Sequence, residues 1–271
     1  MRRLIVNADD FGFTNDVNEG IIEAHHRGIL TATTLMATGG AFQHAVIMAK
    51  ESPELDVGVH LTLVGTRALS RPERALPPTV RGLVGEIALG TLDVFKEMEA
   101  QLMRVVNAGL IPTHFDTHKH THLHPRVLDA TLDLAAKYGI RWVRRPFDLP
   151  LPAEAVVPAR KRWTARAMTF RRGAFDRRVV SRGIWATDHF AGFQVTGRID
   201  TALLSRILAA VPDGVTEFMC HPGRCGTELL QAQTRLKESR ARELAALCAV
   251  ETKEALRNSG VILTRYRDLS R

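Results

Sequence analysis

Short apolar runs alternate with longer amphipathic stretches along most of this chain. The runs at 4–7, 57–59 and 216–219 are only three or four residues long, and polar side chains follow each of them. Such runs are typical of buried parallel strands, whereas the stretches between them repeat apolar residues at helical spacing. The pattern predicts a parallel sheet of the α/β class. We expect strands at 4–7, 35–37, 57–59, 113–115, 141–143, 216–219 and 261–263, and helices at 14–27, 42–51, 92–107, 125–138, 203–210 and 229–257.

The ends of two predicted helices carry clear sequence signals. Thr14 is a residue of the kind that caps a helix, and Gly28 follows the last turn of the same stretch. Pro125 suits the first turn of a helix, and Gly139 follows its end. Proline near the start and glycine just past the end is the order expected for helix boundaries.

The composition is that of a globular protein. Of 271 residues, 45% are apolar and 24% are charged, which excludes a disordered chain, a collagen-like chain and a disulfide-stabilised miniprotein. The three cysteines, Cys220, Cys225 and Cys248, are odd in number and fit a reducing compartment. The apolar run after the N-terminal arginines is too short for a signal peptide, and no run of about 18 apolar residues is present. We therefore expect a cytoplasmic protein.

The net charge of +8 lies in one segment. Residues 159–182 hold nine basic residues and one acidic residue, Asp176, and removing them from the totals of 37 basic and 29 acidic residues leaves 28 of each sign. Trp163, Phe170 and Phe175 are interleaved with these cations. The excess charge therefore belongs to this basic segment, and the rest of the fold is neutral.

Three roles fit the basic segment. It could lie on an anionic membrane, with apolar side chains in the interface and guanidinium groups among the headgroups. It could instead be a solvated helical insertion whose arginines pair with acids elsewhere in the fold. Nucleic-acid binding is the third reading, and we do not expect it. The residues predicted to contact lipid are Arg160, Lys161, Arg162, Trp163, Arg166, Phe170, Arg171 and Arg172.

Ionisable side chains follow five of the predicted strands. Parallel α/β folds place their active sites at the carboxyl ends of the strands, so these side chains are expected to converge. Any one of them alone would be a weak signal, because acids at strand ends are common turn or cap residues and single histidines commonly pack in cores. In chain order they are Asp9 and Asp10, then His60, then Asp116 and His118, then Arg144, and finally His221.

Three of these side chains form a usual ligand set for one divalent metal ion. Asp10, His60 and His118 could hold the ion and leave a position open for water. The metal would polarise a bound carbonyl group and make the water more acidic. Asp9 could then accept the water's proton. Neighbours on a strand point to opposite faces, so we expect a turn at residues 11–12 to let both carboxylates converge.

Two further strand-end residues have predicted roles in the same reaction. His221 could donate a proton to a leaving amine, and Arg144 could keep Asp9 ionised through a charge-assisted hydrogen bond.

The segment 113–125, THFDTHKHTHLHP, holds five histidines. In an extended strand every second one would share a face. Spacing does not fix which of them binds metal, and a chance cluster or an adventitious metal-binding tract is the alternative.

Four segments of the chain resemble the YdjC-like carbohydrate deacetylases. They are LIVNADDFG at 4–12, GVHLTL at 58–63, THFDTHKHTHLHP at 113–125 and CHPG at 220–223, in the order of that family. The resemblance implies a TIM-barrel-like (β/α) barrel, with seven strands or an irregular closure as alternatives. It also implies metal-dependent removal of an acetyl group from an N-acetylated sugar. We expect one such domain over 1–271, with a basic amphipathic insertion at about 159–183.

The resemblance implies roles for individual residues. Zinc is the favoured ion, with magnesium or another divalent ion as alternatives. The segment RRPF at 144–147 resembles an element that orients the base, in which Arg145 is a rival to Arg144. The implied metal ligands are Asp10, His60 and His118, the base is Asp9, the acid is His221, and the predicted substrate contacts are Arg145, His122 and Phe11.

Within that family the chain is most similar to the hopanoid-biosynthesis deacetylases, which implies an N-acetylglucosaminyl hopanoid lipid as substrate. The basic segment would let a cytoplasmic enzyme reach such a sugar at the inner membrane face. The alternatives are a deacetylase of soluble chitooligosaccharides, a phosphoesterase with two metals, and a non-catalytic sugar-lipid binder. A homo-oligomer is compatible with the sequence.

Overall fold

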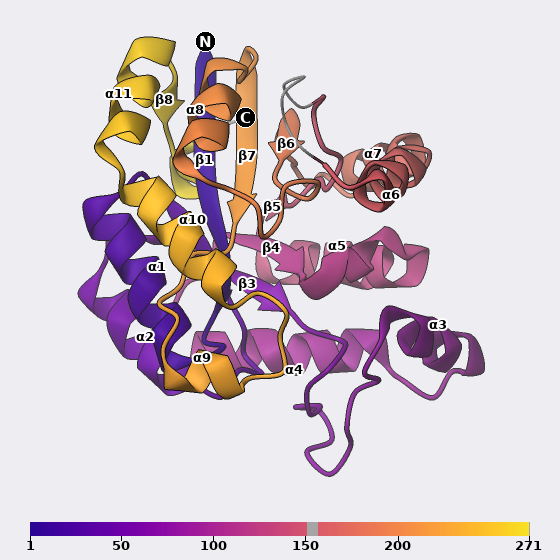
Figure 1. Ribbon diagram of the computed structural model, residues 1–271. Coiled ribbons are helices and arrows are strands. Elements are labelled where there is room, and N and C mark those ends of the chain that lie inside the picture. Colours follow the sequence, from indigo (N-terminus) through magenta and orange to yellow (C-terminus); the bar gives the residue numbers. More distant parts are fainter. Residues whose placement is uncertain (151–156, 271) are drawn as a thin grey trace.

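A single parallel sheet forms the centre of the computed structural model, which describes residues 1–150 and 157–270. The strand order is β5-β4-β3-β2-β1-β7-β6, and β8 pairs with β1 outside this path (Figure 1). Every pairing between these strands is parallel. The strands are β1 (Arg2–Phe11), β2 (Ala32–Leu35), β3 (Asp56–Leu61), β4 (His114–Thr117), β5 (Trp142–Val143), β6 (His189–Ala191), β7 (Gly214–Cys220) and β8 (Ile262–Leu263).

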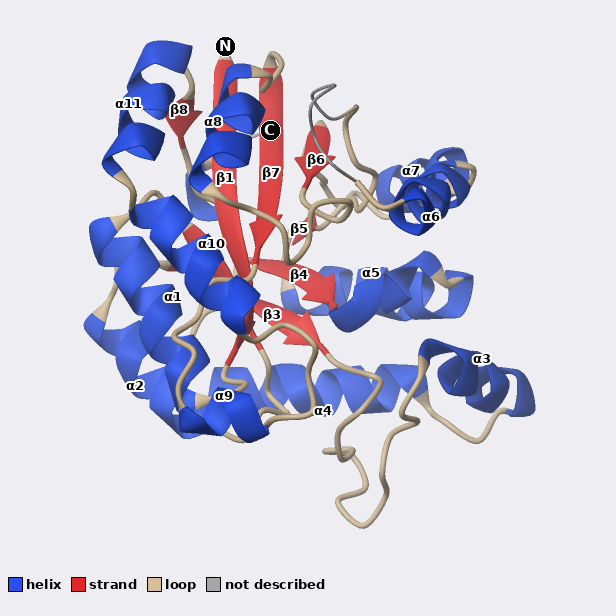
Figure 2. Ribbon diagram, in the orientation of Figure 1, coloured by secondary structure: helices blue, strands red, loops and turns tan. Residues whose placement is uncertain are grey.

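Helices follow the strands and lie around the outside of the sheet (Figure 2). None of the helices in the described ranges is long and apolar enough to cross a membrane. The α-helices are α1 (Asn15–Arg27), α2 (Phe42–Glu51), α3 (Val80–Leu89), α4 (Val94–Asn107), α5 (Pro125–Tyr138), α6 (Ala159–Thr169), α7 (Arg172–Ser181), α8 (Thr201–Ala209), α9 (Thr227–Gln231), α10 (Glu238–Cys248) and α11 (Val250–Ser259), and short 3-10 helices span His118–Leu123 and Tyr266–Asp268.

The two ends of the strand path approach each other, so the sheet curls into a barrel. Isolated parallel bridges join Trp142 to Trp185 and Asp148 to Phe190. The backbone N–H of Leu149 donates to the carbonyl of Phe190 at 2.7 Å. The predicted α/β barrel is confirmed, with seven strands on the main path, and isolated bridges link β5 to the segment before β6 and β6 to the segment after β5.

Polar side chains fill part of the buried core. Asn7, His114 and Glu217 are fully buried, on β1, β4 and β7. The His114 ring stacks on Tyr266 of the C-terminal segment with 4.0 Å between ring centroids, and its Nε2 lies 3.1 Å from the Asn7 side-chain oxygen. Buried polar groups need such partners, because an unpaired one costs free energy. These residues therefore form a hydrogen-bonded polar layer within a core that is otherwise mainly apolar.

Most predicted elements are confirmed close to their expected bounds. The helices at 42–51 and 125–138 match α2 and α5, and the Thr14 side chain caps α1 by accepting from the backbone N–H of Val17. The strand expected at 35–37 is displaced and occupies Ala32–Leu35.

Two elements were not predicted, and one prediction needs correction. The segment 80–89, for which no element was predicted, forms α3. Strand β6 is only three residues long, too short for a period-two pattern to show. The single helix expected at 229–257 is broken into α9, α10 and α11, with extended backbone at Ala232 and Ala249.

The basic segment folds into α6 and α7, which have different surroundings. Helix α7 buries Phe175 and Val179 and pairs with acids of α5, with Arg178 3.1 Å from Asp129 and Arg182 2.8 Å from Asp133. Helix α6 has no buried residue. Helix α7 is therefore packed on the rest of the fold through two apolar side chains, whereas α6 buries none of its residues.

Helix α1 packs directly on the turn that follows β7. A Cβ atom at Gly20 would lie 2.4 Å from the Cα of Gly223, two residues after His221. Only a residue without a side chain allows this approach of two backbones. The position of the His221 turn thus depends on Gly20.

We expect Gly20→Ala to lower the free energy of unfolding by about 1–3 kcal/mol, the usual cost of overpacking a core. The matched control is Gly85→Ala in α3, where an added Cβ meets nothing within 4 Å. Alanine favours a helix interior, so this variant should gain about 0.5–1 kcal/mol. Urea denaturation of the three proteins measures both changes, and equal stabilities for the two variants would contradict the close packing.

Candidate active site

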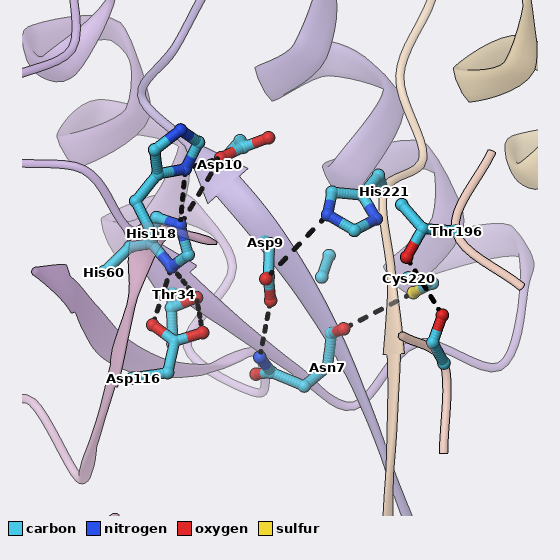
Figure 3. A network of polar contacts seen from close by, with 12 residues as sticks. Asn7, Asp9, Asp10, Thr34, His60, Asp116, His118, Thr196, Cys220 and His221 are labelled. Carbon is cyan, nitrogen blue, oxygen red and sulfur yellow. Dashed lines mark hydrogen bonds and ion pairs between the residues drawn. The ribbon is translucent and has the colours of Figure 1, made fainter. Parts of the chain in front are cut away.

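Two neighbouring carboxylates face one site because β1 changes conformation at Asp10. This residue has φ 70°, and the pairing of β1 with β2 shifts register between Ala8 and Phe11. The left-handed backbone turns the Asp10 side chain to the face that Asp9 already occupies (Figure 3). Both carboxylates lie on one cavity, as expected. The expected turn at residues 11–12 is present, with Gly12 at φ 93° and the backbone N–H of Phe13 donating to the Asp10 carbonyl at 3.1 Å, and the change of direction begins at Asp10.

Asp10, His60 and His118 form a group whose ligand atoms lie within 4.8 Å of one another. Oδ1 of Asp10 lies 3.5 Å from Nε2 of His60 and 3.4 Å from Nδ1 of His118. This oxygen is buried and has no hydrogen-bond partner. One carboxylate and two imidazoles suit zinc and similar divalent ions. An unpartnered buried oxygen between two imidazole nitrogens therefore fits a site for a cation.

His60 is oriented from behind by Asp116. The two side chains form a 2.6 Å contact between Nδ1 of His60 and Oδ1 of Asp116, and Thr34 donates to Oδ2 at 3.1 Å. Burial alone would lower the pKa of His60, but the Asp116 carboxylate raises this pKa to about 9. Carboxylates in this position fix the ring of a metal-binding histidine and point its other nitrogen at the ion.

Arg144 holds Asp9. Its Nη1 and Nη2 donate to the two Asp9 oxygens at 2.8 and 2.6 Å, and its Nε donates to Glu217 at 2.7 Å. Burial alone would raise the pKa of Asp9, but the Arg144 guanidinium keeps it well below its usual range. The structure therefore brings Arg144 to Asp9 as predicted. Its rival Arg145 donates instead to Asp176, at 2.6 Å.

His221 lies at the end of β7, on the other side of Asp9. Its Nε2 is 3.9 Å from Oδ2 of Asp9, and its backbone N–H donates to Glu243 at 2.6 Å. Burial lowers the pKa of His221 to about 4, so the ring is neutral at pH 7. A neutral imidazole can receive a proton before it donates one.

These groups open onto a cavity of about 830 Å³. Asp9, Asp10, His118 and His221 lie on its wall. This volume is in the usual range for small-molecule sites. The remaining wall combines aromatic rings and cations, with Phe13, Phe193, Lys161, Arg235 and Lys237 among them.

The three predicted substrate contacts do not lie on this wall. Phe11 is buried under the site and fully covered. His122 is also fully buried, and its ring nitrogens contact Thr117 and the carbonyl of Arg144 at 2.6 and 3.1 Å. Arg145 is tied to Asp176 and to the carbonyl of Asp188. In this structure each of the three is held by protein groups, so none contacts the cavity.

The histidine segment does not form the extended strand that the alternation required. Lys119 and His120 have φ 56° and 51°, so the chain turns sharply after His118. As a result His120 lines the cavity, between Phe190 and Phe193 at centroid distances of 5.9 and 5.5 Å, and His122 does not.

Sequence reasoning missed three buried charged residues at the site, Glu217, Arg240 and Glu243, and named Asp116 at a strand end without giving it a role. Glu217 is a lone acid inside the apolar strand at 214–220, and Asp116 precedes His118 by two residues; both were visible signals. Arg240 and Glu243 share a face of α10, but nothing distinguishes them in a helix with many charges.

Comparisons with known proteins agree with the geometry. The family model described as YdjC-like protein matches residues 3–258. A carbohydrate deacetylase of Brevibacillus brevis is 34% identical over 98% of this chain and 99% of its own, and a chitooligosaccharide deacetylase of Serratia marcescens is 30% identical over 98% of each. The crystal structure of a putative cellobiose-phosphate cleavage protein from Enterococcus faecalis V583 has a TM-score of 0.76 at 27% identity, covering 100% of this chain and 99% of that one.

One prediction concerns metal uptake. After chelation and dialysis, the protein is expected to bind one equivalent of Zn²⁺. His118→Ala should weaken that binding by more than about 100-fold. Removing a metal ligand lowers metal affinity more than removing a residue that only orients a ligand. The matched control is His189→Ala, since His189 contacts the carbonyl of Asp213 and is absent from the metal-binding group. Isothermal titration calorimetry measures all three affinities. Equal affinities for both variants would contradict the site.

Proposed function

We propose a substrate and a mechanism for this chain, which belongs to the YdjC-like family and is a carbohydrate deacetylase. The reaction is the hydrolysis of an N-acetyl amide on an amino sugar, with one divalent metal ion, zinc by preference. The substrate is a lipid-linked sugar, N-acetylglucosaminyl hopanoid. The observation that carries the reaction is the convergence of Asp10, His60 and His118 around an unpartnered oxygen, beside the ionised Asp9.

The metal would be held by Asp10, His60 and His118. When bound, it would polarise the acetyl carbonyl and stabilise the negative charge that develops on its oxygen. Asp9 accepts a proton as the water oxygen attacks the carbonyl carbon. Arg144 keeps the carboxylate ionised and aims it through two hydrogen bonds.

His221 completes the reaction when the carbon–nitrogen bond breaks. It is neutral at rest, so the proton that it donates must first reach it. Asp9 lies 3.9 Å away and carries the proton taken from water. We infer that this proton passes from Asp9 to His221 and then to the sugar nitrogen, which leaves as the amine while acetate forms.

The surroundings of Arg144 argue against a phosphoesterase with two metals. A second group, Asp9, His60 and Asp116, has ligand atoms close enough for an ion. Arg144 already pairs with both carboxylates, at 2.6 Å from Asp9 and 2.5 Å from Asp116. A second metal would have to displace this buried guanidinium, so the arrangement favours a single ion.

The preference for a lipid-linked substrate rests on the position of α6 beside the cavity. Lys161 of this helix lines the cavity and donates to the carbonyl of Phe193 at 2.8 Å. On the same helix Trp163 is 70% exposed, and Phe170, which follows it, is 86% exposed. The helix therefore has one residue at the site and aromatic side chains in solvent.

The cations of α6 strengthen this proposal. Arg160, Arg162 and Arg166 are exposed. By contrast, Arg178 of α7 and the following Arg182 form ion pairs with acidic residues of α5. Aromatic and cationic side chains together suit the interface of an anionic membrane. We propose that α6 lies on the cytoplasmic face of the membrane and brings the cavity to the sugar headgroup.

Asp9→Asn is expected to lower acetate release by at least about 100-fold, the lower end of what a general base contributes, while leaving Zn²⁺ binding within a few-fold of the parent. Asparagine keeps the shape of the side chain but cannot accept the proton. Acetate is measured with a coupled assay and metal by calorimetry. Turnover close to that of the parent would show that another group is the base.

A second prediction tests the substrate. The parent should release acetate faster from N-acetylglucosaminyl hopanoid in anionic vesicles than from diacetylchitobiose. Trp163→Ser with Phe170→Ser should lower the first rate and leave the second unchanged, because these side chains lie outside the cavity. The matched control is Leu89→Ser, an exposed apolar residue of α3 that is 79% accessible. Equal loss on both substrates, or none on vesicles, would contradict the lipid-linked assignment.

A further inference from the structure

Arg240 is a buried cation that neither the sequence motifs nor the proposed proton transfers use. It lies near the start of α10 and is 1% exposed. Its Nη2 donates to Oδ2 of Asp10 at 2.5 Å. The aliphatic part of its side chain lies against the turn that contains His221 and Gly223. A Cβ atom at Gly223 would lie 3.2 Å from Cδ of Arg240.

The two oxygens of Asp10 have different surroundings because of this contact. Oδ2 is bound by Arg240, whereas Oδ1 has no hydrogen-bond partner and faces the two histidines. Asp10 therefore presents one charged oxygen to His60 and His118 in a fixed orientation.

We infer that Arg240 is a positioning residue that makes Asp10 a ligand through a single oxygen. A free aspartate beside a divalent ion can offer both oxygens. With Oδ2 occupied by the guanidinium, only Oδ1 is available, and a position stays open for substrate. This inference rests on the proposed metal site and concerns how that site is kept open.

The backbone of Asp10 adds a second reason for such an anchor, because its φ of 70° lies in the left-handed region. A non-glycine residue in the left-handed region costs about 1–2 kcal/mol. The contact with Arg240 ties this residue to α10. Glu243 of the same helix accepts a hydrogen bond from the backbone N–H of His221. The same helix thus positions a metal ligand and the proposed acid.

The experiment loads the full-length protein with Co²⁺, whose visible absorption weakens as the number of ligands rises. Arg240→Met keeps the stem and removes the charge. It should still bind Co²⁺, show weaker bands than the parent, and lose about 10- to 100-fold in kcat with a smaller change in KM, as for other residues behind a ligand. Arg240→Lys, which can still pair with Oδ2, should keep most of the parent's band intensity and provides the test if the methionine variant does not fold.

The matched control is Arg242→Met, since Arg242 is exposed on the same helix. It should match the parent in spectrum and turnover. If the parent takes up no Co²⁺, the metal site itself is wrong. If the parent binds Co²⁺ and a folded Arg240→Met has the parent's spectrum, the metal site stands and the role of Arg240 is overturned. A folded Arg240→Lys whose Co²⁺ spectrum differs from that of the parent would also overturn the role of Arg240.

Discussion

The site depends on one backbone constraint: two adjacent residues of a strand must present their side chains to the same cavity. A regular strand sends Asp9 and Asp10 to opposite faces. The left-handed φ at Asp10 removes this conflict at a cost of about 1–2 kcal/mol. Each carboxylate is then held by its own arginine, Asp9 by Arg144 and Asp10 by Arg240. One deformation of β1 therefore places the proposed base and the proposed metal ligand side by side, and each of them is bound by a different guanidinium.

Burial of so much charge is a second constraint, and it explains the polar interior. Arg144 faces Asp9, Asp116 and Glu217 with little solvent to help. Burial raises the pKa of Glu217 to about 7, so this carboxyl is only partly ionised at neutral pH. A buried charge is tolerated when partners satisfy it, but such a network seldom adds stability over an apolar core. What this layer does in the structure is orient Asp9 and His60 through direct hydrogen bonds.

The sequence predicted the parts of the site that sit at strand ends. Acidic residues and histidines that directly follow short apolar runs were predicted to lie at the site, because the carboxyl ends of parallel strands lie at one edge of the sheet. This argument located Asp9, Asp10, His60, His118 and His221. It failed where local conformation departs from the regular period. The left-handed residues 119–120 place His120 on the cavity in place of His122. Arg240 was beyond sequence reasoning, since its partner is 230 residues away and only the packing of α10 brings them together.

The distribution of charge connects the barrel to its proposed substrate. The net charge of the whole chain resides in the basic segment, so the remaining surface supplies no net attraction to an anionic bilayer. Within the segment, Arg178 and Arg182 pair with acids of α5, whereas the exposed aromatic rings and most of the exposed cations lie on and just after α6. Attraction concentrated on one helix fixes the orientation of the molecule on a membrane, whereas the same charge spread evenly would not. Because Lys161 of that helix lies on the cavity wall, the proposed orientation of α6 on a membrane would also bring the cavity close to the bilayer. This coupling would favour the proposed lipid-linked sugar and would give a soluble sugar no advantage.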